Sequence, residues 1–130
     1  MIKQDNQFVV RVFEVLSQNP TASEIDFLIE AHTRIGYLAA IAQGQADQAE
    51  DQRKYEEATK YREVKDENPK WTQAQVEAAV MVACYDFRKG ENKAAEEAKK
   101  LANLLDSVRE GINGIKYLGR NGGGDVRIGP

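Results

Sequence analysis

The sequence predicts an all-α protein built on a long antiparallel hairpin of two helices, and three observations support this prediction. Apolar residues recur at spacings of three and four over most of the 130 residues, which is the period of an amphipathic helix. Two segments open with the spacing of a capping box, Thr21 with Glu24 and Thr72 with Gln75. Between them lies one short helix-breaking segment, residues 66–69, and so short a connection requires the two helices to run antiparallel.

Residues 1–20 are expected to form a short N-terminal segment packed on this hairpin. The apolar run FVVRVFEVL allows two interpretations: its β-branched residues favour a strand, and the spacing of Phe8, Val12 and Val15 also fits one face of a helix. We favour a short helix, because a lone strand has no partner with which to pair.

The first long helix is predicted over residues 21–65. Glu24 and Asp26 suit the positive end of the helix dipole, and no strong breaker follows before the connection. One stripe of residues, spaced by three and four, should face the second helix: Ile25, Leu28, His32, Ile35, Ala39, Ala42, Ala46, Ala49 and Arg53.

The second long helix is predicted over residues 72–119, with residues 120–130 as a flexible glycine-rich tail and residues 1–120 as a single helical domain. Its stripe is interrupted once, where the step from Ala94 to Ala98 repeats a spacing of four and locally unwinds a coiled coil. Gly119 is expected to end the helix. The stripe consists of Val76, Val80, Ala83, Phe87, Gly90, Ala94, Ala98, Leu101, Leu105, Val108, Ile112 and Ile115.

The end of this second helix combines glycine with positive charge. Gly111 and Gly114 lie beside stripe residues, where they allow either close approach of another helix or a bend. Lys116 and Arg120 fit the negative end of the helix dipole, and the sharper alternative is a basic tail that contacts nucleic acid or a partner.

Two helices packed on each other bury only one stripe on each helix, so apolar residues outside these stripes must be buried by something else. We therefore expect either the N-terminal segment or other copies of the chain to bury them, and we expect a homo-oligomer. The residues off the seam are Ile29, Tyr37, Leu38, Leu104 and Leu118.

Charge and composition narrow the function classes. The net charge of −3 gives no global attraction for nucleic acid, so any such contact needs a local patch. The single cysteine, Cys84, excludes an internal disulfide. The chain shows neither the pattern of a signal peptide nor an apolar run of the ~20 residues that span a bilayer, so we expect a soluble, cytoplasmic protein with no membrane contact.

We do not expect an enzyme, a cofactor or a metal site. The sequence holds no common catalytic or phosphate-binding motif. His32 falls on the apolar stripe, where a hydrogen-bonded core histidine is the plainer interpretation and a functional histidine the alternative. Cys84 has no activating base nearby in the predicted helix.

The hairpin tip, residues 53–71, mixes cations with aromatic residues, the combination that binds single-stranded nucleic acid. Its acidic residues leave a net charge of only +1, so a solvated tip with ion pairs is the competing interpretation. With the two cations of the second helix, the nucleic-acid-binding candidates are Arg53, Lys54, Tyr55, Lys60, Tyr61, Arg62, Lys65, Lys116 and Arg120.

The layout of residues 20–120 resembles small helical bacteriophage recombination mediators of the UvsY type. The resemblance lies in the capped first helix TASEIDFLIEAHTRIGYLAA, the tip ATKYREV and the closing helix LANLLDSVREGINGIKYLGR. Lys60 and Arg62 look like the family's Lys-x-Arg pair that contacts DNA, although the family's adjacent tyrosine pair does not follow Arg62. The resemblance implies a ring-like oligomer in the host cytoplasm, with a recombinase or a single-strand-binding protein as partner.

Two functional hypotheses follow. The first is a non-enzymatic oligomeric accessory protein of phage-type DNA recombination or replication, which binds single-stranded DNA and helps to load a recombinase. The alternative is a structural or adaptor protein, such as a virion component or assembly factor, that acts through packing of its helices on another protein.

Overall fold

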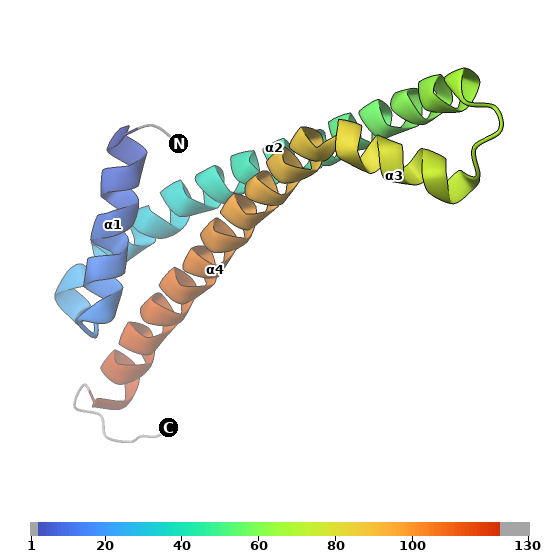
Figure 1. The fold of residues 1–130 in the computed structure, drawn as a ribbon. Helices are drawn as coiled ribbons and strands as arrows, with labels where there is room; N and C mark the ends of the chain where they lie inside the picture. The colour runs from blue at the N-terminus through green and yellow to red at the C-terminus, as the bar shows by residue number, and fades with distance from the viewer. Residues whose placement is uncertain (1–2, 123–130) are drawn as a thin grey trace. The chain divides into compact units, whose positions relative to one another are not determined.

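The computed structural model describes the backbone of residues 3–122 and the side chains of residues 4–117. Figure 1 shows the helices of this part of the chain, which holds no strand. They are α1 (Lys3–Ser17), the 3-10 turn η1 (Ala22–Glu24), α2 (Ile25–Glu67), α3 (Gln73–Ala83) and α4 (Tyr85–Gly122). The all-α class is confirmed, and so is the packing of two long helices, α2 and α4, against each other.

The chain divides into two compact units, and α2 and α4 each pass through both. Unit 1 contains residues 1–40 and 99–130, and unit 2 contains residues 41–98. Each unit has its own apolar cluster, so each is described by itself.

The core of unit 1 is formed by three helices. Leu28 and Ile35 of α2, Val108 of α4 and Val12 of α1 have no exposed surface, and each such side chain contributes about 1.5–3 kcal/mol on burial. Four further residues of α1 pack on this cluster: Phe8, Val9, Val15 and Leu16. The segment that the sequence left open between strand and helix is therefore a helix, packed on α2 and α4.

Alternating arginine and aromatic side chains also fix α1 against α2. The guanidinium of Arg34 lies 3.7 Å from the centre of the Phe8 ring, and that of Arg11 lies 5.0 Å from the centre of Phe27. The two rings are 5.7 Å apart and tilted by 53°. Asp5 adds an ion pair to Arg34 at 3.8 Å. Cation–π and tilted aromatic contacts of this kind contribute about 0.5–1.5 kcal/mol each.

Of Gly111 and Gly114 in α4, only Gly111 permits close packing. A Cβ atom at Gly111 would lie 3.0 Å from Cδ2 of Leu16 and 3.6 Å from Cδ1 of Leu28. A Cβ atom at Gly114 would meet nothing within 4 Å. The expectation of close helix approach is confirmed for Gly111, whose missing side chain leaves room for α1.

Unit 2 contains the turn between α2 and α3, where the chain reverses (Figure 1). Asn68 ends α2 with hydrogen bonds from its backbone and side-chain nitrogens to the carbonyl of Val64, at 3.0 and 3.1 Å. Thr72 and Gln75 then form the predicted capping box, with bonds of 2.9 and 3.2 Å. The helices adjoin this turn at Glu67 and Gln73, close to the predicted boundaries.

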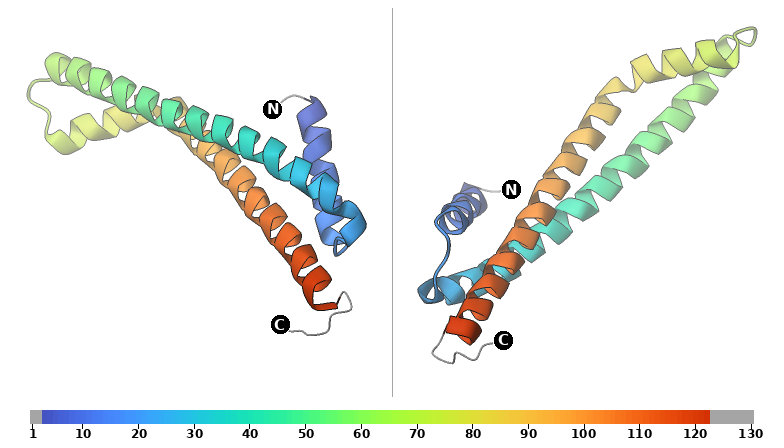
Figure 2. Two further views of the ribbon diagram at one scale, coloured as in Figure 1. Left: turned by 180° about the vertical axis from the view of Figure 1, so that it is seen from behind. Right: turned by 90° about the horizontal axis from the view of Figure 1, so that it is seen from below.

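The second long helix is not continuous, which corrects the prediction for residues 72–119. Cys84 has φ −105° and ψ 18° and separates α3 from α4, and Figure 2 shows the change of direction between them. The N–H of Cys84 donates to the carbonyl of Val80 at 2.8 Å, and its own carbonyl accepts from the N–H of Phe87 at 3.1 Å, so Cys84 ends the hydrogen bonding of α3 and begins that of α4. Neither glycine nor proline marks this position.

The bend also changes which residues of the second helix are buried. Val76, Val80 and Cys84, each four residues from the next, form the buried face with Val64 of α2. Ala83 and Phe87 of the predicted stripe are exposed instead. Residues spaced by four form a row that is inclined to the helix axis. The prediction instead assumed alternating spacings of three and four, which keep the row parallel to the axis.

The first stripe and the off-seam residues follow the prediction in large part. Along α2, Leu28, Ile35, Ala42 and Ala46 are buried, while His32 is half-buried beside the fully buried Ala31. Of the off-seam residues, Leu104 joins the core and Leu38 packs on it, whereas Ile29 and Tyr37 stay exposed. The side chain of Leu118 lies outside the described residues.

The end of α4 extends beyond its predicted stop. The helix passes Gly119 and reaches Gly122, because a glycine within a helix costs only about 1 kcal/mol and does not by itself end it. Most of the segment expected to be a flexible tail, residues 123–130, lies outside the described residues.

Candidate functional site

Arg53, one of the predicted nucleic-acid-binding residues, is held by two carboxylates of unit 2. Its Nε and Nη2 donate to the two carboxylate oxygens of Glu91 at 3.1 and 3.0 Å, and its Nη1 donates to Glu57 at 3.3 Å. Hydrogen bonding to Glu91, supported by Glu57, raises the pKa of Arg53 above its ordinary value. The side chains of Arg53 and Glu91 are only 19% and 16% exposed. The positive charge of Arg53 is therefore neutralised within the fold, and its role in nucleic-acid binding stays a prediction.

A second arginine completes this network. Nε and Nη2 of Arg88 donate to Glu57 at 2.6 and 3.1 Å. The resulting chain of ion pairs, Glu91–Arg53–Glu57–Arg88, ties α2 to α4 within unit 2. Paired arginine–carboxylate forks of this kind are stronger than single surface ion pairs. The sequence indicated this network through the position of Arg53, which ends a mainly apolar stripe. A cation at such a position is expected to pair with carboxylates of the facing helix.

Two of the predicted lysines are paired on their own helix. Lys54 donates to Glu50 at 2.8 Å, which raises the pKa of Lys54 and lowers that of Glu50. Lys60 donates to Glu63 at 3.4 Å. Both ion pairs are solvent-exposed and therefore weak, so an incoming anion can compete with the carboxylates for these lysines.

The remaining tip residues differ in accessibility. Arg62 and Lys65 are exposed and form no ion pair within the part of the chain that the structure describes. Tyr55 is exposed and lies seven residues before Arg62, which is two helical turns and hence nearly the same side of α2. Tyr61, by contrast, packs on the buried cluster of unit 2, so only part of its ring is available for stacking.

The two predicted cations of α4 belong to unit 1. Lys116 is exposed near the end of the described side chains, and Tyr117 beside it is also exposed. The side chain of Arg120 lies outside the described residues. The tip residues of α2 belong to unit 2, so the structure does not join the nine predicted residues into one described site.

The sequence analysis missed an exposed apolar surface on α3 and the first residue of α4, here named the outer face: Ala78, Met81, Val82 and Tyr85. Met81, Val82 and Tyr85 are 56%, 80% and 60% exposed, and Ala78 is also exposed. The opposite side of the same helix is the buried Val76–Val80–Cys84 face. Within α3 the only charged residue is Glu77. A helix that is apolar all round is normally buried on all sides, so the outer face has the character of a contact surface.

A hollow of about 420 Å³ borders the outer face. It is lined by residues of α2, α3 and α4, all within unit 2: Glu57, Ala58, Tyr61, Glu77, Val80, Met81 and Arg88. Its walls combine apolar side chains with both signs of charge. Because the charge of Glu57 is already paired with Arg53 and Arg88, the lining offers a polyanion no unpaired cation.

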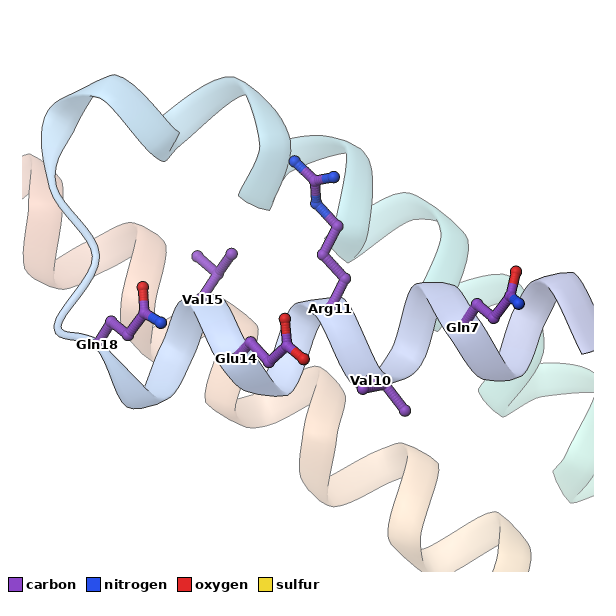
Figure 3. A pocket seen from close by; sticks show the side chains of 6 residues that line it. All are labelled: Gln7, Val10, Arg11, Glu14, Val15 and Gln18. Carbon is purple, nitrogen blue, oxygen red and sulfur yellow. The ribbon is translucent and has the colours of Figure 1, made fainter.

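A second, smaller hollow of about 330 Å³ runs along α1 in unit 1 (Figure 3). Figure 3 shows Arg11 extending toward α2, whereas Val10 points away from it. The lining residues are Gln7, Val10, Arg11, Glu14, Val15 and Gln18. They all come from one helix, and Arg11 is already engaged with Phe27, so this hollow positions no convergent set of polar groups.

The residues considered for catalysis have ordinary structural surroundings. Burial raises the pKa of the Cys84 thiol, with smaller contributions from Glu57 and Glu56, so the reactive thiolate is disfavoured. His32 is half-buried in unit 1. Among the residues that the structure describes, no group of three or more His, Cys, Asp and Glu side chains could hold a metal ion. No helix in the same range has the length and apolar character needed to cross a membrane.

Comparison of the chain with protein-family models, curated proteins and solved structures finds no match.

Proposed function

We propose that the protein is a structural or adaptor protein that acts by packing the outer face of α3 against another helical surface. The proposal assigns binding rather than catalysis to the chain, with unit 2 as the part that makes the contact. Unit 1, with α1 packed on α2 and α4, provides a second folded unit on the same two long helices.

The observation that carries the proposal is the exposure of Met81 and Val82 on one side of α3, whose other side is buried, together with the exposed Tyr85 at the start of α4. Exposed aliphatic residues scattered singly need no explanation, whereas a continuous apolar face on a nearly uncharged helix does. Covering such a face stabilises a complex by roughly 25 cal/mol per Å² of apolar surface removed from water.

The experiment compares two substitutions at neighbouring positions of α3. Val82→Glu places a charge in the outer face, and Ala83→Glu places the same charge on an exposed position outside it. In native extracts of cells that produce the chain, the wild type and Ala83→Glu should migrate in an assembly larger than the folded monomer, and Val82→Glu should migrate as the monomer. Monomeric migration of the wild type would overturn the proposal.

A second candidate function is single-stranded DNA binding, in the manner of the recombination mediators that the sequence resembles. The observation in its favour is that Tyr55, Arg62 and Lys65 are exposed on α2 and the two cations are not engaged in ion pairs within the described residues. Cations that contact the backbone and an aromatic ring that stacks on a base are the usual components of such a surface.

Fluorescence anisotropy of a labelled single-stranded oligonucleotide, titrated at several salt concentrations, tests this second candidate. Replacing both Arg62 and Lys65 by alanine should reduce the salt slope of binding by about 1–2. Each phosphate contact that is lost means that binding releases about one counterion fewer. Arg53→Ala should leave the slope unchanged, since Arg53 is already neutralised by Glu91 and Glu57. Absence of salt-dependent binding by the wild type would exclude the DNA-binding function.

A further inference from the structure

We propose that two copies of this chain exchange α1, so that α1 of each copy packs on α2 and α4 of the other. The inference goes beyond the proposed function, because it concerns unit 1 and not the outer face. It names a contact surface, the part of α2 and α4 that α1 covers, together with the helix that fills it. The contacts of α1 and the conformation of its link to α2 support it.

The chemistry that fits this surface is known, because α1 already fills it within one chain. Val12 has no exposed surface, and Phe8 and Leu16 pack on the same apolar cluster. A second copy offers an identical surface, so an exchanged α1 makes the same apolar contacts and the same arginine–aromatic contacts. Exchange of an identical element between two copies is a low-cost route to a dimer, since no new complementary surface is needed.

The link between α1 and η1, residues 18–21, is strained in the closed chain. After Gln18 the chain turns back toward α2 (Figure 3). Asn19 has a φ of 55°, and it is the only residue other than glycine with a positive φ among those that the structure describes. Pro20 follows, and the residue before a proline prefers an extended backbone. Opening the link relieves this strain, and exchange keeps α1 packed while the link is open. Short links under strain invite such swapping.

The closed monomer and the exchanged dimer differ mainly at the link, which sets the expected concentration range. A short link holds α1 near its own chain at an effective concentration on the order of 1 mM. Each dimer relieves two strained links, which together favour exchange by roughly tenfold to hundredfold. We therefore expect a dimer with a dissociation constant on the order of 10–100 µM.

Sedimentation equilibrium of purified link variants tests the cause of the exchange. Asn19→Gly removes the strain, because glycine adopts a positive φ freely, and should raise the dissociation constant by roughly tenfold or more. Gln18→Gly, the matched control, places glycine in the same link at a residue without a positive φ and should change the constant less than about threefold. Deleting Asn19 and Pro20 together should prevent α1 from closing on its own chain. This shortened chain should be a dimer at concentrations well below the wild-type constant and should keep the wild-type helical signal.

Disulfide formation between two chains identifies the exchanged helix. Leu16 lies against Gly111, where a Cβ atom would be 3.0 Å from Cδ2 of Leu16. One chain carries Leu16→Cys and a second chain, made longer by a tag, carries Gly111→Cys, both in a Cys84→Ala background. Refolded together above the dissociation constant and then oxidised, they should form a covalent dimer of one chain of each length. Gly114→Cys is the matched control and should form little, because a Cβ atom there meets nothing within 4 Å.

Three results would overturn the exchange of α1. The first is a wild-type chain that stays monomeric at millimolar concentration, and the second is equal crosslinking from positions 111 and 114. The third is a dimer that is lost in Val82→Glu but is unchanged in Asn19→Gly, because this dimer would form through the outer face. The last result would leave the proposed function in place, so the two proposals fail separately.

Discussion

The guanidinium of Arg53 on α2 holds the carboxylate of Glu91 on α4 through two hydrogen bonds, 3.1 and 3.0 Å long. This fork, extended through Glu57 to Arg88, joins the two helices of unit 2 at a point where small residues dominate the predicted seam. It also removes Arg53 from the set of cations available to an external ligand. One structural relationship thus changes both the stability and the functional interpretation of the tip.

Replacing Arg53 by methionine should lower the thermal stability of the chain by a few degrees, because Glu91 then loses both hydrogen bonds and lies near Glu57 without a shared cation. Lys54→Met is the matched control. Its partner Glu50 is solvent-exposed, so the melting temperature should hardly change. Circular dichroism melts of the two variants make the comparison, and equal shifts would contradict the assignment of the Arg53 fork.

Gly111 and Gly114 of α4 should respond in opposite directions to larger side chains. Gly114→Ala meets nothing within 4 Å and should raise the free energy of unfolding by about 0.5–1 kcal/mol. Gly111→Leu must displace Leu16 and Leu28 and should lower it by about 1–3 kcal/mol. Urea denaturation measures both. A stabilising Gly111→Leu would show that α1 does not pack closely on α4.

The contact between Phe8 and Arg34 predicts that replacing Phe8 by alanine lowers the free energy of unfolding much more than replacing Phe13 does. Phe8→Ala removes a half-buried ring that touches Phe27 and the Arg34 guanidinium, and should cost about 2–3 kcal/mol. Phe13→Ala removes an exposed ring and should cost less than about 0.5 kcal/mol. Chemical denaturation gives the free energies, and similar values for the two variants would contradict the packing of α1.

Cys84 should make stability depend on alkaline pH. Burial raises the pKa of its thiol in the folded chain above the unfolded value of about 9. The folded state therefore keeps a proton that the unfolded state loses, and the stabilisation is complete below pH 9 and is lost as pH rises through the folded pKa. Comparing the pH dependence of unfolding for the wild type and Cys84→Ala isolates this contribution. Identical profiles above pH 9 would refute it.

The sequence predicted well those features that depend on local chemistry and regular spacing. The capping box at Thr72, the turn after Asn68 and the apolar stripe through Leu28 and Ile35 all follow from patterns within a few residues of one another. The bend at Cys84 was not predictable in this way, because no glycine or proline marks it.

The candidate site was harder to predict, because it depends on which groups meet between helices. Six cations at the tip looked alike in the sequence, yet Arg53 is captured by Glu91, 38 residues further on, while Arg62 remains exposed. The outer face was not predicted, because the sequence analysis expected only one apolar stripe on each helix. On this helix Val76 and Val80 already belonged to that stripe. The sequence did contain a sign of this face. Met81 and Val82 add apolar residues outside the stripe, on a helix whose only charged residue is Glu77.

The most direct test of the contact through the outer face is photo-crosslinking within cells that produce the chain. A photoreactive residue is placed at position 82 in one version and at position 83 in the other, so that the two differ only in the side of α3 that carries the probe. Position 82 should give a discrete crosslinked product, whether with a second copy or with another protein, and position 83 should give little. Equal or absent crosslinking at the two positions would contradict a docked outer face.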